Sequence, residues 1–266
     1  MKDYGLVSII TPTYNSAEFV RETIDSIIAQ TYTNWELLIT DDQSTDDTFY
    51  IIEKYVLKDK RIKVFQLSQN GGAGVARNNS IKEAQGSYIA FCDSDDKWCP
   101  NKLEKQLLFM SKMNCVFSYT SYLETDEEGK LLGIDICNEK ETLYSIIRNN
   151  RIGCLTAMYN VEVVGKVYMP TIRKRQDWGL WILLLQKCHI AYGLMEPLSI
   201  YRVRKGSLSN KKWNLVKYNI ALYENVLSYS NYKAILVFLF KFSPSYLCYK
   251  LKKKIRRLFT SCSLDI

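Results

Sequence analysis

The chain has 266 residues, of which 47% are hydrophobic and 13% aromatic, and it carries 36 Lys and Arg against 28 Asp and Glu. This length and apolar content suffice for one large α/β domain with a substantial core, and they exclude an intrinsically disordered chain. The net charge of +8 is unevenly distributed. Residues 211–260 hold eleven basic residues and one acid, a local charge of +10, whereas the remainder is close to neutral at −2.

Eight cysteines are spread along the chain without a Cys-x-x-Cys pair, and several lie within apolar runs. Met1 leads within a few residues into a strand-like segment, so we expect no signal peptide. Reduced, mostly buried thiols in a cytosolic protein therefore explain the cysteines better than disulfides or a zinc site. The best candidate for a membrane span, 234–248, is interrupted by Lys241 and Pro244, so a span is not expected.

The first part of the chain alternates between strand and helix patterns. Strands are predicted at 6–11, 35–40, 62–67 and 87–92, and helices at 17–30, 46–58 and 73–85. Strands separated by helices imply βαβ units and a mainly parallel sheet with helices on both faces. In such sheets ligands bind beyond the carboxyl ends of the strands.

A polar stretch follows each predicted strand. These stretches are TPTYN (11–15), DDQSTDD (41–47), SQNGGAGVARN (68–78) and DSDD (93–96). Because the carboxyl ends of parallel strands lie along one edge of a sheet, we expect the four stretches to converge on one crevice.

Part of this pattern has a purely structural explanation. Ser44, Asp46 and Asp47 fit an N-cap with acids in the first turn of a helix, which leaves Asp41 and Asp42 unexplained. The NGGAG segment is equally well explained as a turn into the next helix. It is not a dinucleotide fingerprint, because it follows the third strand and lacks the GxGxxG spacing.

Asp93, Ser94 and Asp95 form a DxD sequence directly after a buried strand-like run. Side chains two residues apart in extended backbone point to the same side, so both carboxylates can face one ion. Together with Asp96 they place three like charges close together, which favours a cation among them. An acidic turn is the simpler alternative. Since oxygen ligands suit Mg²⁺ or Mn²⁺ shared with substrate phosphates, we predict a divalent metal on Asp93 and Asp95 that binds a diphosphate.

The blocks VSIITPTYN, LLITDDQSTDDT, NGGAGVARNNSI and GSYIAFCDSDD, in this order, resemble family 2 glycosyltransferases, which are inverting nucleotide-diphospho-sugar enzymes. The resemblance is dense over 5–110 and thinner to about 205, and it implies the Rossmann-like GT-A fold. The residues that we expect to bind the donor are Thr11, Pro12, Tyr14, Asp42, Arg77, Asp93, Ser94 and Arg175. The family pattern implies that Asp42 hydrogen-bonds the uracil imide and that Asp93 and Asp95 hold the ribose and the metal.

An inverting transferase also needs a base that takes the proton from the acceptor hydroxyl. The one histidine, His189, follows an apolar helical run and is better explained as structural. Asp177 is the better candidate, because it lies between basic residues and the aromatic Trp178 and Trp181, which mark a possible wall of a site. The alternative is an acid that stabilises the start of a helix.

The resemblance supports the catalytic assignment of Asp177. The family carries one or two acids before an aromatic helix at this place, and here Gln176 stands where many relatives have Glu. Arg175, next to this pair, could contact the leaving diphosphate. No QxxRW sequence follows, whereas processive synthases of the family carry that motif together with membrane helices. We therefore expect transfer of a single sugar.

The basic C-terminal region has a second, independent implication. In YKLKKKIRRLF (249–259), Lys and Arg alternate with aliphatic and aromatic residues, which on a helix gives a basic amphipathic surface suited to anionic phospholipid. A solvated C-terminal helix is the alternative, and nucleic acid is disfavoured because no reader motif is present. We expect a catalytic domain over 1–210, divided into a nucleotide-sugar half (1–110) and an acceptor half (111–210), followed by a helical basic tail (211–266).

The resemblance extends to bacterial enzymes that add glucose or galactose to GlcNAc- or GalNAc-diphospho-undecaprenol during synthesis of surface polysaccharide such as O-antigen. It implies a UDP-sugar donor, a lipid-diphosphate acceptor and a peripheral location on the cytoplasmic face of the inner membrane. Two alternatives stay open, a catalytically inactive nucleotide-sugar-binding scaffold and a nucleotidyltransferase. Intact Asp42, Asp93, Asp95 and Asp177 argue against the first, and the absence of a GxGxR loop after the first strand argues against the second.

Overall fold

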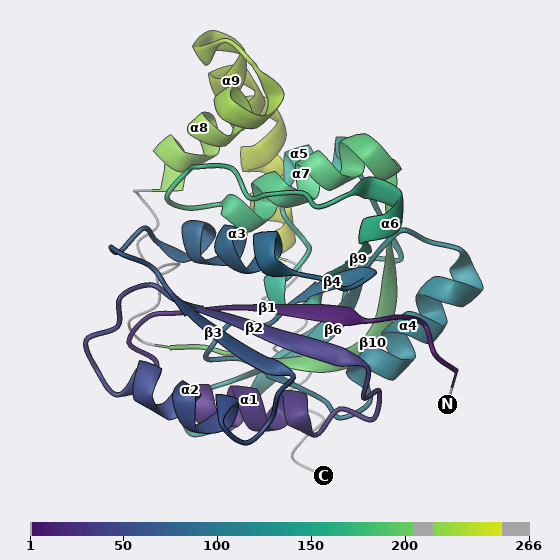
Figure 1. The fold of residues 1–266 in the computed structure, drawn as a ribbon. Helices are drawn as coiled ribbons and strands as arrows, with labels where there is room; N and C mark the ends of the chain where they lie inside the picture. The colour runs from purple at the N-terminus through teal and green to yellow at the C-terminus, as the bar shows by residue number, and fades with distance from the viewer. Residues whose placement is uncertain (1, 205–214, 252–266) are drawn as a thin grey trace.

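The computed structural model describes residues 2–204 and 215–251 (Figure 1). The strands are β1 Val7–Thr13, β2 Trp35–Asp41, β3 Ile62–Gln66, β4 Tyr88–Phe91, β5 Lys97–Trp98, β6 Phe117–Thr125, β7 Leu131–Asp135, β8 Lys140–Thr142, β9 Met158–Asn160 and β10 Ile190–Arg202. The helices are α1 Val20–Ile28, α2 Thr48–Val56, α3 Ala73–Glu83, α4 Lys102–Met113, α5 Leu143–Arg148, α6 Val161–Val164, α7 Gln176–Cys188, α8 Leu215–Leu227 and α9 Asn231–Val237. The strands and helices predicted up to residue 92 are all confirmed, with ends shifted by a few residues.

The strands form one ten-stranded sheet in the order β3-β2-β1-β4-β9-β6-β10-β5, with β7 paired to β6 and β8 paired to β10. Parallel pairing joins β3, β2, β1 and β4, and also β6 and β10. The short strand β9 is antiparallel to both β4 and β6, so these two groups of strands run in the same direction. The predicted α/β fold with a mainly parallel sheet is therefore confirmed.

Helices cover both faces of this sheet: α1 and α2 lie on one side, and α3, α5 and α7 lie on the other (Figure 1). Successive residues of β1 supply the two cores in turn, with Val7 and Ile9 in the core beneath α1 and Ile10 in the core beneath α7. Burial on both faces explains why apolar residues of the first strand do not alternate with exposed polar ones. The polar Ser8 within the strand is buried, and its hydroxyl donates to Glu36 Oε1 at 2.7 Å.

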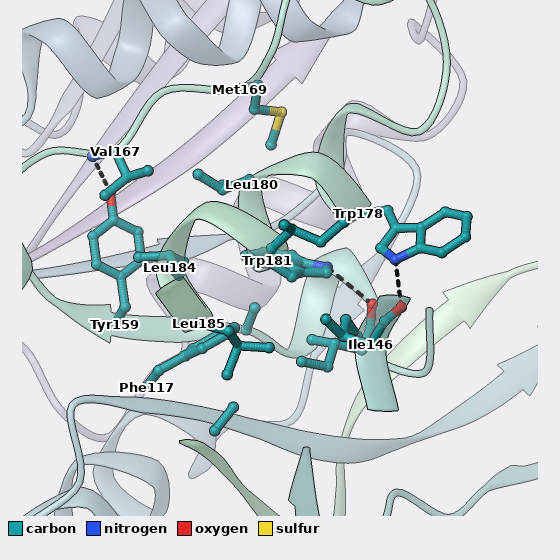
Figure 2. Packing of buried hydrophobic residues seen from close by; sticks show 14 of the residues in the cluster. Phe117, Ile146, Tyr159, Val167, Met169, Trp178, Leu180, Trp181, Leu184 and Leu185 are labelled. Atoms are coloured by element: carbon teal, nitrogen blue, oxygen red, sulfur yellow. Dashed lines mark hydrogen bonds between the residues drawn. The ribbon is translucent and has the colours of Figure 1, made fainter. Parts of the chain in front are cut away.

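Helix α7 provides the centre of the second core through Trp178 and Trp181, both of which are fully buried. Their indole nitrogens donate hydrogen bonds to the carbonyl oxygens of Ile146 at 2.7 Å and Ile152 at 3.2 Å (Figure 2). The interpretation of these tryptophans as a wall of the site is therefore wrong, because both rings lie inside the hydrophobic core. They instead fasten the segment 146–152 to α7.

Helix α4 packs on β6 and β10, whereas the C-terminal helices pack on α7 and α5. Tyr223 of α8 donates its hydroxyl to the Ile147 carbonyl oxygen at 2.8 Å, and its ring contacts Trp178 edge-on. A continuous helix then runs over Asn231–Leu251, which we call helix 231–251. Phe242 from this helix also packs on Trp178, with ring centroids 5.5 Å apart.

Pro244, which interrupts the apolar run 234–248 in the sequence, lies within helix 231–251 without breaking it. The helix contains a π-helical turn, Phe238–Phe242, and the Ser243 amide donates to the Phe238 carbonyl oxygen. A proline ring collides with the carbonyl four residues earlier in a regular α-helix, and a wider turn relieves that collision. Within the described part of the chain, helix 231–251 is the one that is long and apolar enough to cross a membrane by length and composition alone.

Cysteine and histidine positions agree with structural roles. The seven cysteines within the described residues are free, and most are buried or half-buried. His189 caps the C-terminal end of α7 with a backbone φ of 64° and does not line the cavity described below.

Candidate active site

A cavity of about 800 Å³ opens at the carboxyl ends of the strands. Its lining includes Tyr14 after β1, Asp93 and Asp95 after β4, Arg204 after β10, and Asp177 in the first turn of α7. This is the edge where ligands bind in sheets of this class, and the volume is typical of a small-molecule site. The ends of β1 and β4 therefore converge as predicted.

The aspartates after β4 are paired with arginines. Arg77, which is buried, donates to Asp93 Oδ1 at 2.5 Å, and Arg204 donates to Asp95 Oδ2 at 3.1 Å. Asp96 is almost fully buried and accepts the backbone N–H of Arg202 at 3.0 Å. Arginines thus supply part of the positive charge that the acidic cluster requires.

The cluster still favours additional positive charge. Burial, followed by the negative charge of Asp93, raises the pKa of Asp95 above its usual range. Burial also raises the pKa of Asp96 far above its usual range, and the charges of Asp95 and Asp93 add to that rise. A carboxylate that is hard to ionise in the absence of a cation becomes easier to ionise when one is bound.

The donor set fits a divalent metal. Each of the two salt bridges uses one oxygen, Asp93 Oδ1 or Asp95 Oδ2, so the other oxygen of each aspartate is left for a cation. Among residues 2–204 and 215–251, no group of three or more His, Cys, Asp and Glu side chains is arranged to hold an ion. Asp93 and Asp95 could therefore provide two oxygens, with the remaining ligands coming from substrate and water, as is usual for Mg²⁺.

Asp177 is held in place by a neighbouring amide. The side chain of Asn150 donates to Asp177 Oδ2 at 3.1 Å, and its own Oδ1 accepts the Ile152 backbone N–H at 3.2 Å. The tryptophans of α7 fix this segment, so the core of the second half determines where Asn150 lies. One oxygen of Asp177 is thereby oriented and the other can accept a proton.

Of the basic residues before Asp177, Arg175 reaches the same cavity. Its Nε donates to the Asn219 Oδ1 of α8 at 3.0 Å. Lys174 instead lies over the ring of Tyr218, 5.9 Å from its centroid, and Arg173 is exposed and does not line this cavity. The basic run therefore contributes one of its three side chains here.

Four predicted donor-binding residues do not line this cavity. Thr11 and Pro12 lie within β1 and are buried. Ser94 is buried, and its hydroxyl lies 2.9 Å from that of Ser16. Their roles in nucleotide binding stay predictions, and Thr11 and Pro12 could act through their backbone as the family pattern implies.

Asp42 is the fourth of these residues. Its carboxylate accepts the backbone N–H groups of Gly71 at 2.7 Å and Gly72 at 2.8 Å. The loops after β2 and β3 are therefore bonded to each other. The stretch 41–47 after β2 does not line this cavity, whereas the stretch 68–78 after β3 contributes Arg77, so the expectation that all four polar stretches form one crevice holds for three of them. A uracil at Asp42 would share the carboxylate with this loop.

Several residues that line the cavity were missed from sequence, notably Asn150, Arg202 and Arg204. The two arginines follow an alternating strand-like run and end it with charge, which is the same signal that identified Asp93. Asn150 lies in a loop between short elements, where no periodicity marks it. Its role depends on a contact across 27 positions of the chain.

The family model for glycosyl transferase family 2 matches residues 8–163 of this chain. TuaG of Bacillus subtilis (strain 168), a glycosyltransferase whose name assigns it to teichuronic acid biosynthesis, is 44% identical over 222 residues, covering 83% of this chain and 88% of that protein. WfgD of Escherichia coli, a UDP-Glc:alpha-D-GlcNAc-diphosphoundecaprenol beta-1,3-glucosyltransferase, is 38% identical over 218 residues, covering 82% of this chain and 84% of that protein.

Solved structures show the same fold. TarS 1-349 of S. aureus, in complex with UDP-GlcNAc, aligns with a TM-score of 0.67 at 23% identity, covering 87% of this chain and 70% of TarS 1-349. The mannosyltransferase PcManGT from Pyrobaculum calidifontis, in complex with GDP-Man and Mn²⁺, aligns with a TM-score of 0.65 at 15% identity. The alignment covers 88% of this chain and 70% of PcManGT. The family match, the similarity to these relatives and the shared architecture show that the chain belongs to glycosyl transferase family 2 and is a glycosyltransferase of the GT-A fold.

Proposed function

We propose that this enzyme transfers one hexose, glucose or galactose, from a UDP-sugar to a sugar carried on a lipid diphosphate, with inversion at the anomeric carbon. The observation that carries the proposal is that Asp177 lies in one cavity with Asp93 and Asp95 and has one oxygen held by Asn150. A base and a diphosphate-binding cluster around a shared space are what a direct displacement requires.

The proposed chemistry assigns a role to each side of the cavity. Asp177 accepts the proton from the acceptor hydroxyl while that oxygen attacks the anomeric carbon. The bond from that carbon to the diphosphate oxygen breaks, and UDP leaves. Arg204 and Arg77 hold Asp95 and Asp93 in place on the side of the leaving group. A divalent cation, Mn²⁺ or Mg²⁺, on Asp93 and Asp95 would supply a Lewis acid for the negative charge of the diphosphate.

The donor is proposed to lie along the first half of the sheet. Tyr14 is half-exposed at the cavity, where its ring can contact the nucleotide. Asp42 is proposed to accept the uracil N–H beyond the end of β2, with Thr11, Pro12 and Ser94 completing that side. Similarity to WfgD, whose name specifies UDP-Glc and GlcNAc-diphosphoundecaprenol, supports both substrates and a place in bacterial surface polysaccharide synthesis.

A donor and acceptor panel tests this proposal. Radiolabelled UDP-sugars would be incubated with synthetic GlcNAc- and GalNAc-diphospho-lipids, with and without Mn²⁺. The expected result is metal-dependent addition of one hexose to one of these acceptors, with inverted configuration in the product by NMR. UDP binding without any transfer would favour the inactive scaffold, and release of inorganic diphosphate from a nucleoside triphosphate would favour a nucleotidyltransferase.

Helix 231–251 supports a peripheral location at the membrane. Its residues Ala234, Val237 and Phe242 are buried against the domain. Elsewhere on the helix, an exposed stripe of Phe240, Pro244, Leu247 and Leu251 follows the spacing of one helical face. A helix that packs on a domain by one face and presents an apolar stripe on another suits the membrane interface.

We therefore propose that the region 211–266 associates with the cytoplasmic face of the inner membrane. The basic segment 249–259 lies mostly outside the described residues, and its charge is expected to strengthen binding to anionic lipid. Flotation with vesicles that contain anionic phospholipid should recover the full chain at low salt and release it at high salt. Phe240→Ser should weaken flotation, and equal recovery of both proteins would contradict the orientation of the stripe.

A further inference from the structure

A second, smaller hollow lies between α8 and helix 231–251. This groove has a volume of about 230 Å³, and its walls include Val216 from α8 together with Phe238, Phe242 and Leu247 from helix 231–251. Arg175 belongs to the lining of this groove and also to the lining of the catalytic cavity. The two hollows therefore share Arg175 in their linings.

The position of Arg175 is fixed from several sides. Asn219, which is buried on α8, accepts a hydrogen bond from Arg175 Nε at 3.0 Å. The guanidinium lies 5.7 Å from the ring centroid of Trp178. The Arg175 backbone has a φ of 68°, a left-handed conformation that is uncommon for a residue other than glycine.

We propose that the groove binds the first isoprenoid units of the acceptor lipid and that Arg175 pairs with the diphosphate of that lipid; this rests on the proposed function. The acceptor carries a sugar, a diphosphate and a hydrocarbon chain in that order. The structure presents a carboxylate at Asp177, a guanidinium at Arg175 and an apolar groove in the same order. A guanidinium recognises phosphate through paired hydrogen bonds.

The groove is also continuous with the surface proposed to contact the membrane. Leu247 lines the groove and belongs to the exposed stripe, and Leu251 lies one turn further along the same face. A long hydrocarbon chain could therefore leave the groove directly into the bilayer. A phospholipid acyl chain would fit the groove walls, but it offers no sugar hydroxyl for Asp177, which is why we assign the groove to the acceptor.

Steady-state kinetics in solution, with the full chain and without vesicles, tests the assignment. Two acceptors would carry the sugar diphosphate that the unmodified enzyme uses, one as its farnesyl ester and one as its methyl ester. Leu247→Trp and Val216→Trp fill the groove from opposite walls. Leu239→Trp is the matched control, since Leu239 is exposed on the same helix and does not line the groove.

We expect Leu247→Trp and Val216→Trp to raise the KM for the farnesyl acceptor by about tenfold or more. In these variants the hydrocarbon groups of the farnesyl chain can no longer be buried in the groove. The KM for the methyl acceptor should stay within about twofold, the tolerance left for unrelated effects. Leu239→Trp should change neither. Equal increases for both acceptors, or the same effect from Leu239→Trp, would overturn the proposal.

Arg175→Ala separates the acceptor diphosphate from that of the donor. The KM for both acceptors should rise, whereas the KM for the UDP-sugar should not. A selective rise in the KM for the donor would return Arg175 to the leaving diphosphate and overturn this part of the proposal. Competitive inhibition by monomeric dihexanoylphosphatidylcholine would assign the groove to phospholipid. If the unmodified enzyme uses neither acceptor, the proposed function itself is wrong, which is a distinct result.

Discussion

Residues 2–110 and the described residues that follow them are built in different ways. In the first part, β1, β2, β3 and β4 are neighbours in the sheet, and consecutive helices connect them. In the second part, β9 is inserted between β4 and β6, and β10 pairs with both β6 and β5. Strands β1 to β4 are thus folded from local units, whereas the later strands pair with strands that are distant in the sequence.

The polar contacts follow the same division. Asp42 and Asp93 are bonded within the first part, to the Gly71–Gly72 loop and to Arg77. The contacts that complete the cavity come from the second part, where Asn150 holds Asp177 and Arg204 holds Asp95. We infer that the first part binds the donor and the second part positions the reaction. Substitutions in the two parts should accordingly change different measured quantities.

The largest effect is expected from the base. Asp177→Asn should lower kcat by about two to four orders of magnitude, the range for loss of a general base. The affinity for UDP should stay near normal, because Asp177 belongs to the second part. Kinetics per folded molecule and calorimetry with UDP measure the two quantities separately.

A helix-start acid elsewhere provides the control for Asp177. Asp47 is the N-cap residue of α2 and does not line the cavity, so Asp47→Asn should leave turnover unchanged. If Asp177→Asn lowers the melting temperature while kcat per folded molecule is preserved, Asp177 stabilises the start of α7 and is not the base. That result would contradict the inference that the second part positions the reaction.

The next effect concerns the metal. Asp95→Ala, or treatment of the unmodified enzyme with EDTA, should reduce transfer by roughly a hundredfold, corresponding to the several kcal/mol of charge stabilisation that a metal provides. UDP affinity should fall as well, because the diphosphate would lose a counter-ion, and this distinguishes Asp95 from Asp177. Glu22→Gln is a suitable control, since Glu22 pairs with Arg202 but does not line the cavity. Full activity after EDTA treatment would contradict the metal assignment.

The sequence predicted the first part well, for a physical reason. Strands β1 and β2 are buried on both faces, the edge strand β3 is half-buried, and each helix has buried residues on one side, so the local spacing of apolar residues already predicts the structure. The polar strand ends then followed from the direction of a parallel sheet, and Asp93 and Asp95 lie where that argument places them. Asp42 shows the limit of the argument, because the pairing of its carboxylate with Gly71 and Gly72 is not visible from spacing.

The second part could not be predicted in the same way. Trp178 and Trp181 form an aromatic pattern on α7 that suits a core and a site wall equally well, and only the fold shows that both indoles are buried. Asn150 is brought to Asp177 by that core and not by its neighbours in the chain. Pro244 is likewise accommodated by a π-helical turn that the local sequence pattern does not predict. Long-range packing decides each of these positions.

Substitutions of Asn150 should have a smaller effect, and they test whether its long-range contact with Asp177 contributes to turnover. Asn150→Ala should lower kcat by about tenfold, the scale of one lost hydrogen bond to a charged group, and leave the KM for the donor unchanged. Asn150→Asp keeps an acceptor for the Ile152 N–H but can no longer donate to Asp177 when ionised. The Asp variant should therefore retain thermal stability yet lose at least as much turnover as the Ala variant. Equal turnover of the Asp variant and the unmodified enzyme would show that Asn150 only shapes the loop.

The smallest effect is expected at the far end of the donor side. Asp42→Asn should weaken UDP binding by about tenfold or less, because an amide nitrogen replaces one of the acceptor oxygens and a neutral hydrogen bond is worth about 1 kcal/mol. The same change also disturbs the bonds to Gly71 and Gly72, so part of the loss could come from the loop. Asp41→Asn controls for a general disturbance at the end of β2, since Asp41 is also buried and accepts bonds from Ser44 and Gln66 without a predicted contact to the donor. Calorimetry should show a greater loss of UDP affinity for Asp42→Asn than for Asp41→Asn, with kcat at saturating donor little changed in both. An equal loss would mean that the end of β2 supports the fold and that uracil is recognised elsewhere.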